Sequence, residues 1–501
     1  MSDALPPGWV LASLAELTTN PKHDIVSGPF GSNLKSEEYV AEGVPIIRLQ
    51  NVDRNKFLEK NMRFITPQKA QELSAHTFQA GDIVISKLGD PLGKACIIPE
   101  LLPHGVVVAD VVRVRVDESH FCKRYATLAI NSPAVVGQIN QEIKGSTRPR
   151  VNLNHLRDLE IPLAPLAEQR RIVAKLETML SKVDACQQRL AKIPVLLKRF
   201  RQSVLAAACS GHLTADWREE NETESVEPQL LKHAQQDKKF AEALKNGQRF
   251  KSSTPFEWAM LPELPTDWCW GAAAEVVEPG AEIVYGIVQP GPEAPNGVPY
   301  VRGLDIQNGK ILVDQLRRTS REIAKRYERA SLKSGDVLLG IIRHTKVAIV
   351  PSSLNGGNIT QGTARFRPSE LISTGFLARW LESKYAQDWL HHHYRGIDMP
   401  GLNLADVRKL PVPLPPPAEQ QEIVRRVEAL FALADQIEAR FRKAQALVDQ
   451  LTPSLLARAF RGQLVPQDPT DEPAEKLLER IRQAEPRMAR ITRMKRKAAG
   501  P

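Results

Sequence analysis

Cysteine, aromatic residues and long apolar runs are all scarce in this chain of 501 residues. Its five cysteines never form a Cys-x-x-Cys pair. This pattern disfavours a disulfide framework or a zinc site and favours a reduced, cytoplasmic setting. No run approaches the ~18 apolar residues that a membrane span needs. The first residues, MSDALPPGWV, lack the basic and apolar regions of a signal peptide. We therefore expect a cytoplasmic protein with no membrane partner.

Motifs for catalysis are missing as well. The segment GDPLGKA from Gly89 has three residues between its glycines and Ala95 after its lysine, so it does not match a Walker phosphate loop. No Gly-x-Gly-x-x-Gly motif opens a βαβ unit, and no Asn/Asp-Pro-Pro-aromatic motif of an amino-methyltransferase is found. The histidine run His391–His393 has no second cluster and is more typical of a loop or helix end than of a metal site. We expect no catalytic residue, no metal site and no cofactor on this chain.

The charge is only a weak guide to partners. The net charge is +10, but the last fifteen residues alone carry six Lys/Arg and no acid. A basic surface favours polyanions such as DNA. Here much of the excess lies in one terminal segment, so the charge alone does not establish nucleic-acid binding.

The sequence repeats itself at an interval of about 250 residues. PLAPLAEQRRIVAKLE from Pro162 returns as PLPPPAEQQEIVRRVE from Pro413, and the interval of 251 continues without slippage to Gly211 and Gly462. VPIIRLQNV from Val44 returns as VPYVRGLDI, and AGDIVIS returns as SGDVLLG, both after 254 residues. The chain is therefore two copies of one unit.

Each copy contains one long helical stretch with apolar residues at alternating intervals of four and three. This spacing predicts the buried a/d seam of a coiled coil. Gly211 and Gly462 suit the helix ends, and Pro194 and Pro453 predict a kinked helix or one built in two pieces. Two such helices in one chain are expected to pair antiparallel. The predicted seam comprises Ile172, Leu176, Met179, Val183, Leu190 and Leu197 in the first copy and Ile423, Val427, Leu430, Ile437, Phe441 and Val448 in the second.

The remainder of each copy is rich in β-type runs that glycine, proline and asparagine interrupt. The predicted fold class is α+β, with two β-rich domains joined by two long antiparallel coiled-coil helices and a pseudo-twofold internal duplication. The predicted parts are a first domain over 1–160, a first helical region over 161–212, a linker over 213–262, a second domain over 263–410, a second helical region over 411–465 and a basic tail over 466–501.

Several of these motifs together resemble the specificity (S) subunit of type I restriction–modification enzymes. They are the Glu-Gln helix entries at Glu168 and Glu419, SGPFGSNLKSEEY from Ser27 with the following GVPIIRLQNV, and FRQSVLAAACSGHLTADWR from Phe200. The second copy has VYGIVQPGP from Val284 in place of a GPFGS segment. The resemblance covers nearly the whole chain.

The resemblance implies two target-recognition domains that each read one half of a bipartite, asymmetric double-stranded DNA site. It also implies spacer helices that fix the gap and dock two modification subunits. S-adenosylmethionine, ATP and Mg would then bind to partner subunits, which include restriction (motor and nuclease) subunits. The specificity subunit itself would be non-catalytic.

Candidate DNA contacts are basic and amide side chains in segments between strands, because these can reach base edges and phosphates. Arg48 and Arg302 occupy matched positions and could instead form structural ion pairs. The candidates are Lys35, Arg48, Gln50, Asn51, Lys87, Lys94, Arg148 and Arg150 in the first copy and Arg302, Arg343, His344, Lys346, Gln361 and Arg395 in the second.

Two other functions fit the sequence less well. A self-sufficient nuclease or methyltransferase needs motifs that the sequence lacks. A pure coiled-coil scaffold leaves the two β-rich domains without a role. A DNA-recognition subunit accounts for both the helices and the domains.

Overall fold

A computed structural model describes residues 5–29, 33–116, 118, 121–141, 149–235, 259, 261–396 and 398–482. These residues fall into two compact units. Unit 1 lies within Met1–Ala191 and Arg442–Pro501, and unit 2 lies within Lys192–Phe441. The predicted α+β class with an internal duplication is confirmed.

Unit 1 holds the first β-rich region, which we call the first head (β1 to β12). Its sheets run in the orders β1-β12, β6-β3-β10-β7, β2-β11-β8-β9 and β4-β5. Its strands are β1 (Val10–Ser13), β2 (Ile25–Ser27), β3 (Val44–Ile47), β4 (Val52–Asp53), β5 (Lys56–Phe57), β6 (Arg63–Ile65), β7 (Thr77–Gln79), β8 (Ile83–Ser86), β9 (Ala95–Ile97), β10 (His104–Val107), β11 (Val111–Val114) and β12 (Glu160–Leu163). Its helices are α1 (Pro21–Asp24), α2 (Pro67–Glu72), α3 (Lys123–Ile130), α4 (Pro133–Gln141), α5 (Leu153–Arg157) and the long α6 (Leu166–Leu190).

Unit 2 repeats most of this topology in the second head (β13 to β23), without a described counterpart of the edge strand β7. The sheet orders are β13-β23, β14-β22-β19-β20, β18-β15-β21 and β16-β17. The strands are β13 (Cys269–Ala272), β14 (Val284–Tyr285), β15 (Val298–Val301), β16 (Ile306–Gln307), β17 (Lys310–Ile311), β18 (Arg317–Thr319), β19 (Val337–Gly340), β20 (Val347–Ile349), β21 (Asn358–Ile359), β22 (Thr363–Phe366) and β23 (Pro411–Leu414). The helices are α7 (Ile193–Cys209), α8 (Ala215–Glu220), α9 (Glu227–Ala234), α12 (Arg321–Arg326), α13 (Thr374–Glu382), α14 (Lys384–His392), α15 (Leu404–Lys409) and α16 (Pro417–Ala459), whose last turns belong to unit 1.

The repeated Gly-Asp motif begins the central strand of each head. Side chains alternate between the faces of a strand. In β8, Ile83 and Ile85 pack into a core with α3 and α6, whereas Val84 faces a second core between the two sheets. In β19, Val337 and Leu338 divide between two cores in the same way. Both faces of these strands are buried, which explains why their sequence is a continuous apolar run.

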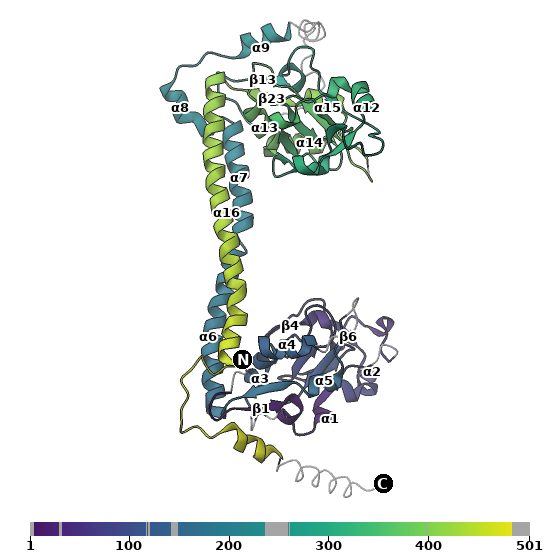
Figure 1. Cartoon of the computed structure of the whole chain (residues 1–501), viewed down its shortest axis with the longest axis vertical. Helices are drawn as coiled ribbons and strands as arrows, with labels where there is room; N and C mark the ends of the chain where they lie inside the picture. Colours follow the sequence, from purple (N-terminus) through teal and green to yellow (C-terminus); the bar gives the residue numbers. More distant parts are fainter. Residues whose placement is uncertain are drawn as a thin grey trace. The chain divides into compact units, whose positions relative to one another are not determined.

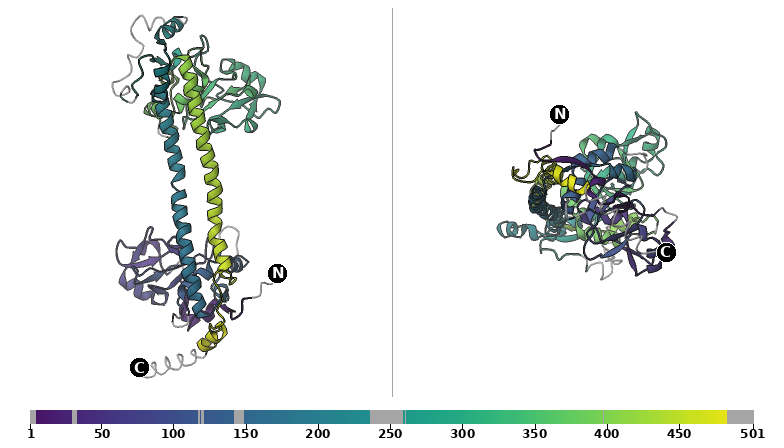
Figure 2. Two further views of the ribbon diagram at one scale, coloured as in Figure 1. Left: turned by 90° about the vertical axis from the view of Figure 1, so that its left-hand side faces the viewer. Right: turned by 90° about the horizontal axis from the view of Figure 1, so that it is seen from below.

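The long helices pair antiparallel within each unit. In unit 1, Ile172 and Leu176 near the start of α6 share a core with Leu456 near the end of α16. In unit 2, Val204 near the end of α7 shares a core with Ile423 near the start of α16. Figures 1 and 2 both show α6 alongside the last turns of α16 within unit 1.

The two helix prolines behave differently. Pro194 lies in the first turn of α7, after the break that follows Leu190, as predicted for a helix in two pieces. Pro453 lies inside α16, which continues as a single helix to Ala459. The last turns persist because Leu455 and Leu456 are buried in the unit 1 core.

The segments after the long helices belong to the cores. Gly211 and Gly462 have φ of 78° and 69°, and a Cβ on either would lie 2.4 Å from Cγ of Pro265 or Pro6, so each site requires glycine. Beyond these glycines, Val226 and Leu230 are buried in the core of unit 2. In unit 1 the buried residues are Ala474, Leu477, Leu478 and Ile481. This corrects the prediction that 213–262 and 466–501 are a linker and a tail, for their described parts.

Candidate functional site

The repeated Glu-Gln motif anchors each long helix to the start of its own head. The indole N–H of Trp9 donates to Oε2 of Glu168 over 3.0 Å. The equivalent Trp268 donates to Oε2 of Glu419 over 2.7 Å. All four side chains are buried, so each bond connects the first strand of a head to the first turn of a helix.

The neighbouring glutamines complete the same joint. The side chain of Gln169 accepts a hydrogen bond from the Cys122 N–H at 3.1 Å and donates to the Ala164 carbonyl at 2.9 Å. Gln420 accepts from the Ser373 N–H at 2.6 Å and donates to the carbonyls of Leu371 and Pro415. A buried amide can satisfy a donor and an acceptor at once, which explains the choice of glutamine after glutamate.

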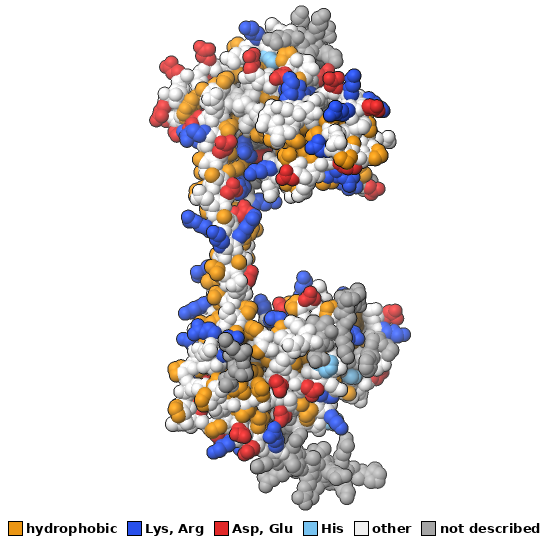
Figure 3. All heavy atoms as spheres, in the orientation of Figure 1, with side chains coloured by type: hydrophobic (Ala, Val, Ile, Leu, Met, Phe, Trp, Pro, Cys, Tyr) orange, Lys and Arg blue, Asp and Glu red, His pale blue; other side chains and the backbone are white. Residues whose placement is uncertain are grey.

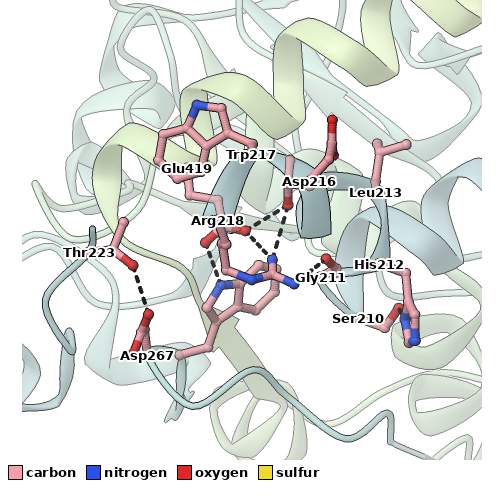
Figure 4. Close-up of polar contacts among 12 residues, drawn as sticks. Ser210, Gly211, His212, Leu213, Asp216, Trp217, Arg218, Thr223, Asp267 and Glu419 are labelled. Atoms are coloured by element: carbon pink, nitrogen blue, oxygen red, sulfur yellow. Dashed lines mark hydrogen bonds and ion pairs between the residues drawn. The ribbon is translucent and has the colours of Figure 1, made fainter. Parts of the chain in front are cut away.

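The two glutamates differ in their remaining partners. Oε1 of Glu419 forms an ion pair with Arg218 and accepts from the Thr214 hydroxyl at 2.6 Å. Arg218 also donates to the Gly211 carbonyl at 2.7 Å, so it connects the end of α7 to the start of α16 (Figure 4). Oε1 of Glu168 is buried without a hydrogen-bond partner in the described part of the chain, and burial raises the pKa of this carboxyl.

Two further ion pairs, each with a buried aspartate, support the heads. Asp82 binds Arg115 through two bonds of 2.9 and 2.7 Å. Asp336 binds Arg367 through two bonds of 2.8 Å. In the sequence these aspartates mark the repeat, but nothing there indicates that they pair with arginines, which recur after 252 rather than 254 residues.

Of the twelve predicted seam residues, six are buried, five are half-buried and one is exposed. Ile437 is 40 % exposed, which corrects its assignment to the seam. The seam instead steps from the buried Ala434 to Glu438, whose carboxylate lies 3.4 Å from Arg201 of α7. Ile172, Leu176, Val183, Leu197, Ile423 and Val427 are buried, and Met179, Leu190, Leu430, Phe441 and Val448 are half-buried.

Three candidate DNA contacts of the first head form hydrogen bonds to a neighbouring loop. Asn51 is fully buried, and its amide donates to the Lys60 carbonyl at 3.0 Å, which corrects its prediction as a DNA contact. Arg48 and the exposed Gln50 both donate to the Asn61 carbonyl. These bonds fix the loop that follows β5.

Lys87 and Arg150 lie together on one side of the first head. Nζ of Lys87 donates to the Ser27 hydroxyl at 2.7 Å, and burial lowers the pKa of this ammonium group. Arg150 lies 2.9 Å from Asp110, whose carbonyl accepts from the Lys87 N–H. The structure therefore places these two predicted contacts around Asp110.

The other first-head candidates are separate. Lys94 forms an ion pair with Asp53 at 3.1 Å. Lys35 is exposed at the start of a short 3-10 turn. Arg148 lies outside the described residues.

In the second head, five candidates lie on adjoining segments. The Ile341 N–H donates to the Gly362 carbonyl, and the Arg343 N–H donates to the Pro400 carbonyl at 2.8 Å. The loop after β19 is thereby held beside the segments that carry Gln361 and Arg395. Arg343, Lys346, Gln361 and Arg395 are exposed, and His344 is half-buried.

Arg302 behaves differently. Its guanidinium binds the buried Asp305 through bonds of 2.9 and 2.8 Å. The structural alternative is therefore the better description of Arg302. Arg48, at the matched position, faces Asn51 rather than an aspartate and forms no such ion pair among the described residues.

No group of three or more metal-ligating side chains occurs among the described residues. The Nδ1 atom of His393 lies 2.8 Å from the Trp389 carbonyl, and its ring stacks on that indole. Within the same residues, no helix is long and apolar enough to span a membrane. In the face shown in Figure 3, acidic and basic side chains are interspersed on both heads, so charge alone does not outline a site.

Comparisons with known proteins agree on one family. A family model described as "Type I restriction modification DNA specificity domain" matches residues 31–195 and 291–446. The EcoBI specificity subunit of Escherichia coli is 33% identical over 465 residues, which cover 90% of this chain and 89% of that protein. A solved structure from work on assembly and conformational transition of the type I R-M system has a TM-score of 0.64 at 18% identity, covering 92% of this chain and 99% of that chain. The HsdS subunit from Thermoanaerobacter tengcongensis has a TM-score of 0.52 at 19% identity, with coverage of 92% and 98%.

Proposed function

The chain belongs to the family of type I restriction–modification DNA specificity subunits, and we propose that each of its heads reads one half of a bipartite, asymmetric DNA site. In this proposal the target-recognition domains occupy about residues 1–160 and 263–410. The chain itself carries no catalytic centre and acts in the cytoplasm.

The observation that carries this proposal is the contrast between a constant frame and variable loops. In the described residues both heads share their strand order, apart from β7 at the edge of one sheet of the first head, and both have an Asp–Arg pair, Asp82–Arg115 and Asp336–Arg367. Several residues at matched loop positions differ, as Gln50 and Leu304 or Gly89 and Arg343 do. Base readout depends on which side chains reach the groove, so two heads with one frame and different loops suit two different sequences.

The long helices are proposed to set the gap between the half-sites and to dock two modification subunits. Several large apolar side chains on them are exposed, which suits a protein partner better than water. In unit 2 these are Val195, Leu196 and Phe200 on α7 and Leu433 and Ile437 on α16, with exposures of 36–58 %.

The modification subunits would bind S-adenosylmethionine and methylate adenine. Restriction subunits that use ATP and Mg would join the same assembly. The buried hydrogen bonds of the Glu-Gln motifs support this arrangement, because the helices can set the distance between the half-sites only if each head is fixed to its helix.

The experiment is a methylome. The chain is co-expressed with the modification subunit encoded beside it in a host that lacks adenine methylation, and N6-methyladenine is mapped by single-molecule sequencing. The proposal predicts one motif with two defined halves around a fixed unspecified gap. An assembled complex that adds no methylation, or that methylates a continuous motif, would contradict it.

A further inference from the structure

In both heads the loop after the central strand (β8 or β19) pairs with the segment that precedes α5 or α15. We call this pairing the bridge. In the first head Leu88 pairs with Arg150, and the Gly89 N–H donates to the Pro149 carbonyl at 3.2 Å. In the second head Ile342 pairs with Gly401, and the N–H of Arg343 donates to Pro400. The intervals of 254 and 251 residues are those of the sequence repeat, so Gly89 and Arg343 occupy one position of the fold.

This position has a positive φ in both heads. Gly89 has φ of 109°, which glycine adopts readily. Arg343 has φ of 65°, a left-handed conformation that disfavours residues with a side chain. The other non-glycine residues with positive φ in the described chain are all Asn or Asp: Asn55, Asn61, Asp110 and Asn308. A long side chain at such a position signals a functional constraint.

The next residue, His344, holds the loop from inside. Its ring lies against Gly303 and Gly340, where an added Cβ would approach the ring to 2.4 Å. The first head has Leu49 and Ser86 at these two places, so only the second head has room for the ring. Burial, with a smaller effect of Lys346, lowers the pKa of His344, which keeps the ring neutral.

Each head nevertheless presents an arginine at the bridge. The second head also has Arg395, which pairs with Gly401, but its guanidinium is held by Asp406 at 2.9 Å. Arg343 comes from the loop after the central strand, and it is exposed and has no ion pair within the described residues. Arg150 lies in the segment that faces the loop carrying Gly89. Its side chain is 58 % exposed and forms an ion pair with Asp110. The first head therefore has Gly89 in the loop and Arg150 in the facing segment, and the second head has Arg343 in the loop and Gly401 in the facing segment.

Resting on the function proposed above, we propose that Arg343 is the base-reading arginine of the second head, that His344 is its positioning residue, and that Arg150 occupies the corresponding place in the first head. The target is a guanine, because the guanidinium fork matches its O6 and N7 atoms in the major groove. The bonded left-handed backbone and the wedged His344 ring fix the backbone position from which the Arg343 side chain extends.

The test uses the full chain in complex with its modification subunits and a panel of duplexes in which each base pair of the second half-site is changed in turn. Arg343→Gly is expected to weaken binding to the cognate duplex roughly 10- to 100-fold and to abolish the preference at one G·C pair. Arg343→Lys keeps the charge and the salt dependence but loses that preference. His344→Asn weakens the preference at the same base pair and at no other.

Thermal unfolding of the free chain gives a second readout. Arg343→Gly relieves the left-handed strain and raises the unfolding temperature by a few degrees. The control Arg317→Gly, in β18 of the same head, lowers it and leaves the base preferences intact.

The outcomes are distinct. A wild-type complex without a bipartite motif would contradict the proposed function. A wild-type complex with the motif, combined with unchanged preferences in Arg343→Gly, would overturn only the present inference. Uniform weakening on all duplexes would also overturn it, because it would place Arg343 on a phosphate.

Discussion

The indole of Trp268 and the carboxylate of Glu419 are 151 residues apart in sequence and are joined by a buried hydrogen bond of 2.7 Å. The bond closes unit 2, because it ties the first strand of the head to the first turn of α16. Trp9 and Glu168 form the same bond in unit 1. Among the described residues, Glu419 also forms an ion pair with an arginine, whereas Glu168 does not. This difference between otherwise matched joints leads to two predictions.

Removing the charge of Glu419 should destabilise unit 2. In Glu419→Gln the guanidinium of Arg218 loses its carboxylate in a largely buried site, where breaking one side of an ion pair costs about 3 kcal/mol. Urea unfolding should show a lower midpoint for unit 2. Glu168→Gln is the matched control, and an equal loss in both variants would show that Arg218 contributes nothing.

Removing the charge of Glu168 should stabilise unit 1 at neutral pH. Because burial raises the pKa of its carboxyl, the native state favours the protonated form. Its contribution to stability is therefore complete below the ordinary value of 4.5 and is lost as the pH rises through the raised value. Glu168→Gln should be more stable than the wild type at pH 7.5, by on the order of 1 kcal/mol, and similar to it at pH 4.5.

The measurement is the difference in unfolding free energy between wild type and Glu168→Gln across this pH range. The difference cancels the other titrating groups, which both proteins share. A difference that does not change with pH would mean that the carboxyl is not perturbed by burial.

The sequence predicted the duplication, the seam and the helix break at Pro194, because periodicity and proline act locally. It could not predict the Trp–Glu bonds, whose partners lie 150 or more residues apart. The prediction of the seam is wrong at Ile437, because the ion pair of Arg201 with Glu438 takes the place of an apolar contact there.

Candidate DNA contacts were harder to predict for the same reason. Whether an Asn or Arg faces solvent depends on loops brought together by the fold, as the burial of Asn51 and the Arg302–Asp305 pair illustrate. One signal was available and was missed. The internal repeat aligns Gly89 with Arg343, which already marks a glycine-type position that carries an arginine.

Lengthening the long helices should change the gap and nothing else. Four residues are inserted after Arg440 in α16 and four at the break after Ala191. Each insertion lengthens one side of the helix pair by about one turn, or about 6 Å. At about 3.4 Å per base pair, the methylated motif should gain one or two unspecified positions between unchanged halves. Insertion of four residues at Asn308, between β16 and β17, is the control and should leave the gap as it was. A longer helix with an unaltered gap would exclude the helices as the spacer.

The most direct measurement of the central claim is a head exchange read by methylome sequencing. Residues 270–410 are replaced by the corresponding segment of a family member with a known and different site, and the chimera is assembled with the same modification subunits. We predict that one half of the motif changes to that of the donor, while the other half and the gap persist. A chimera that changes both halves, or neither, would contradict the assignment of one half-site to each head.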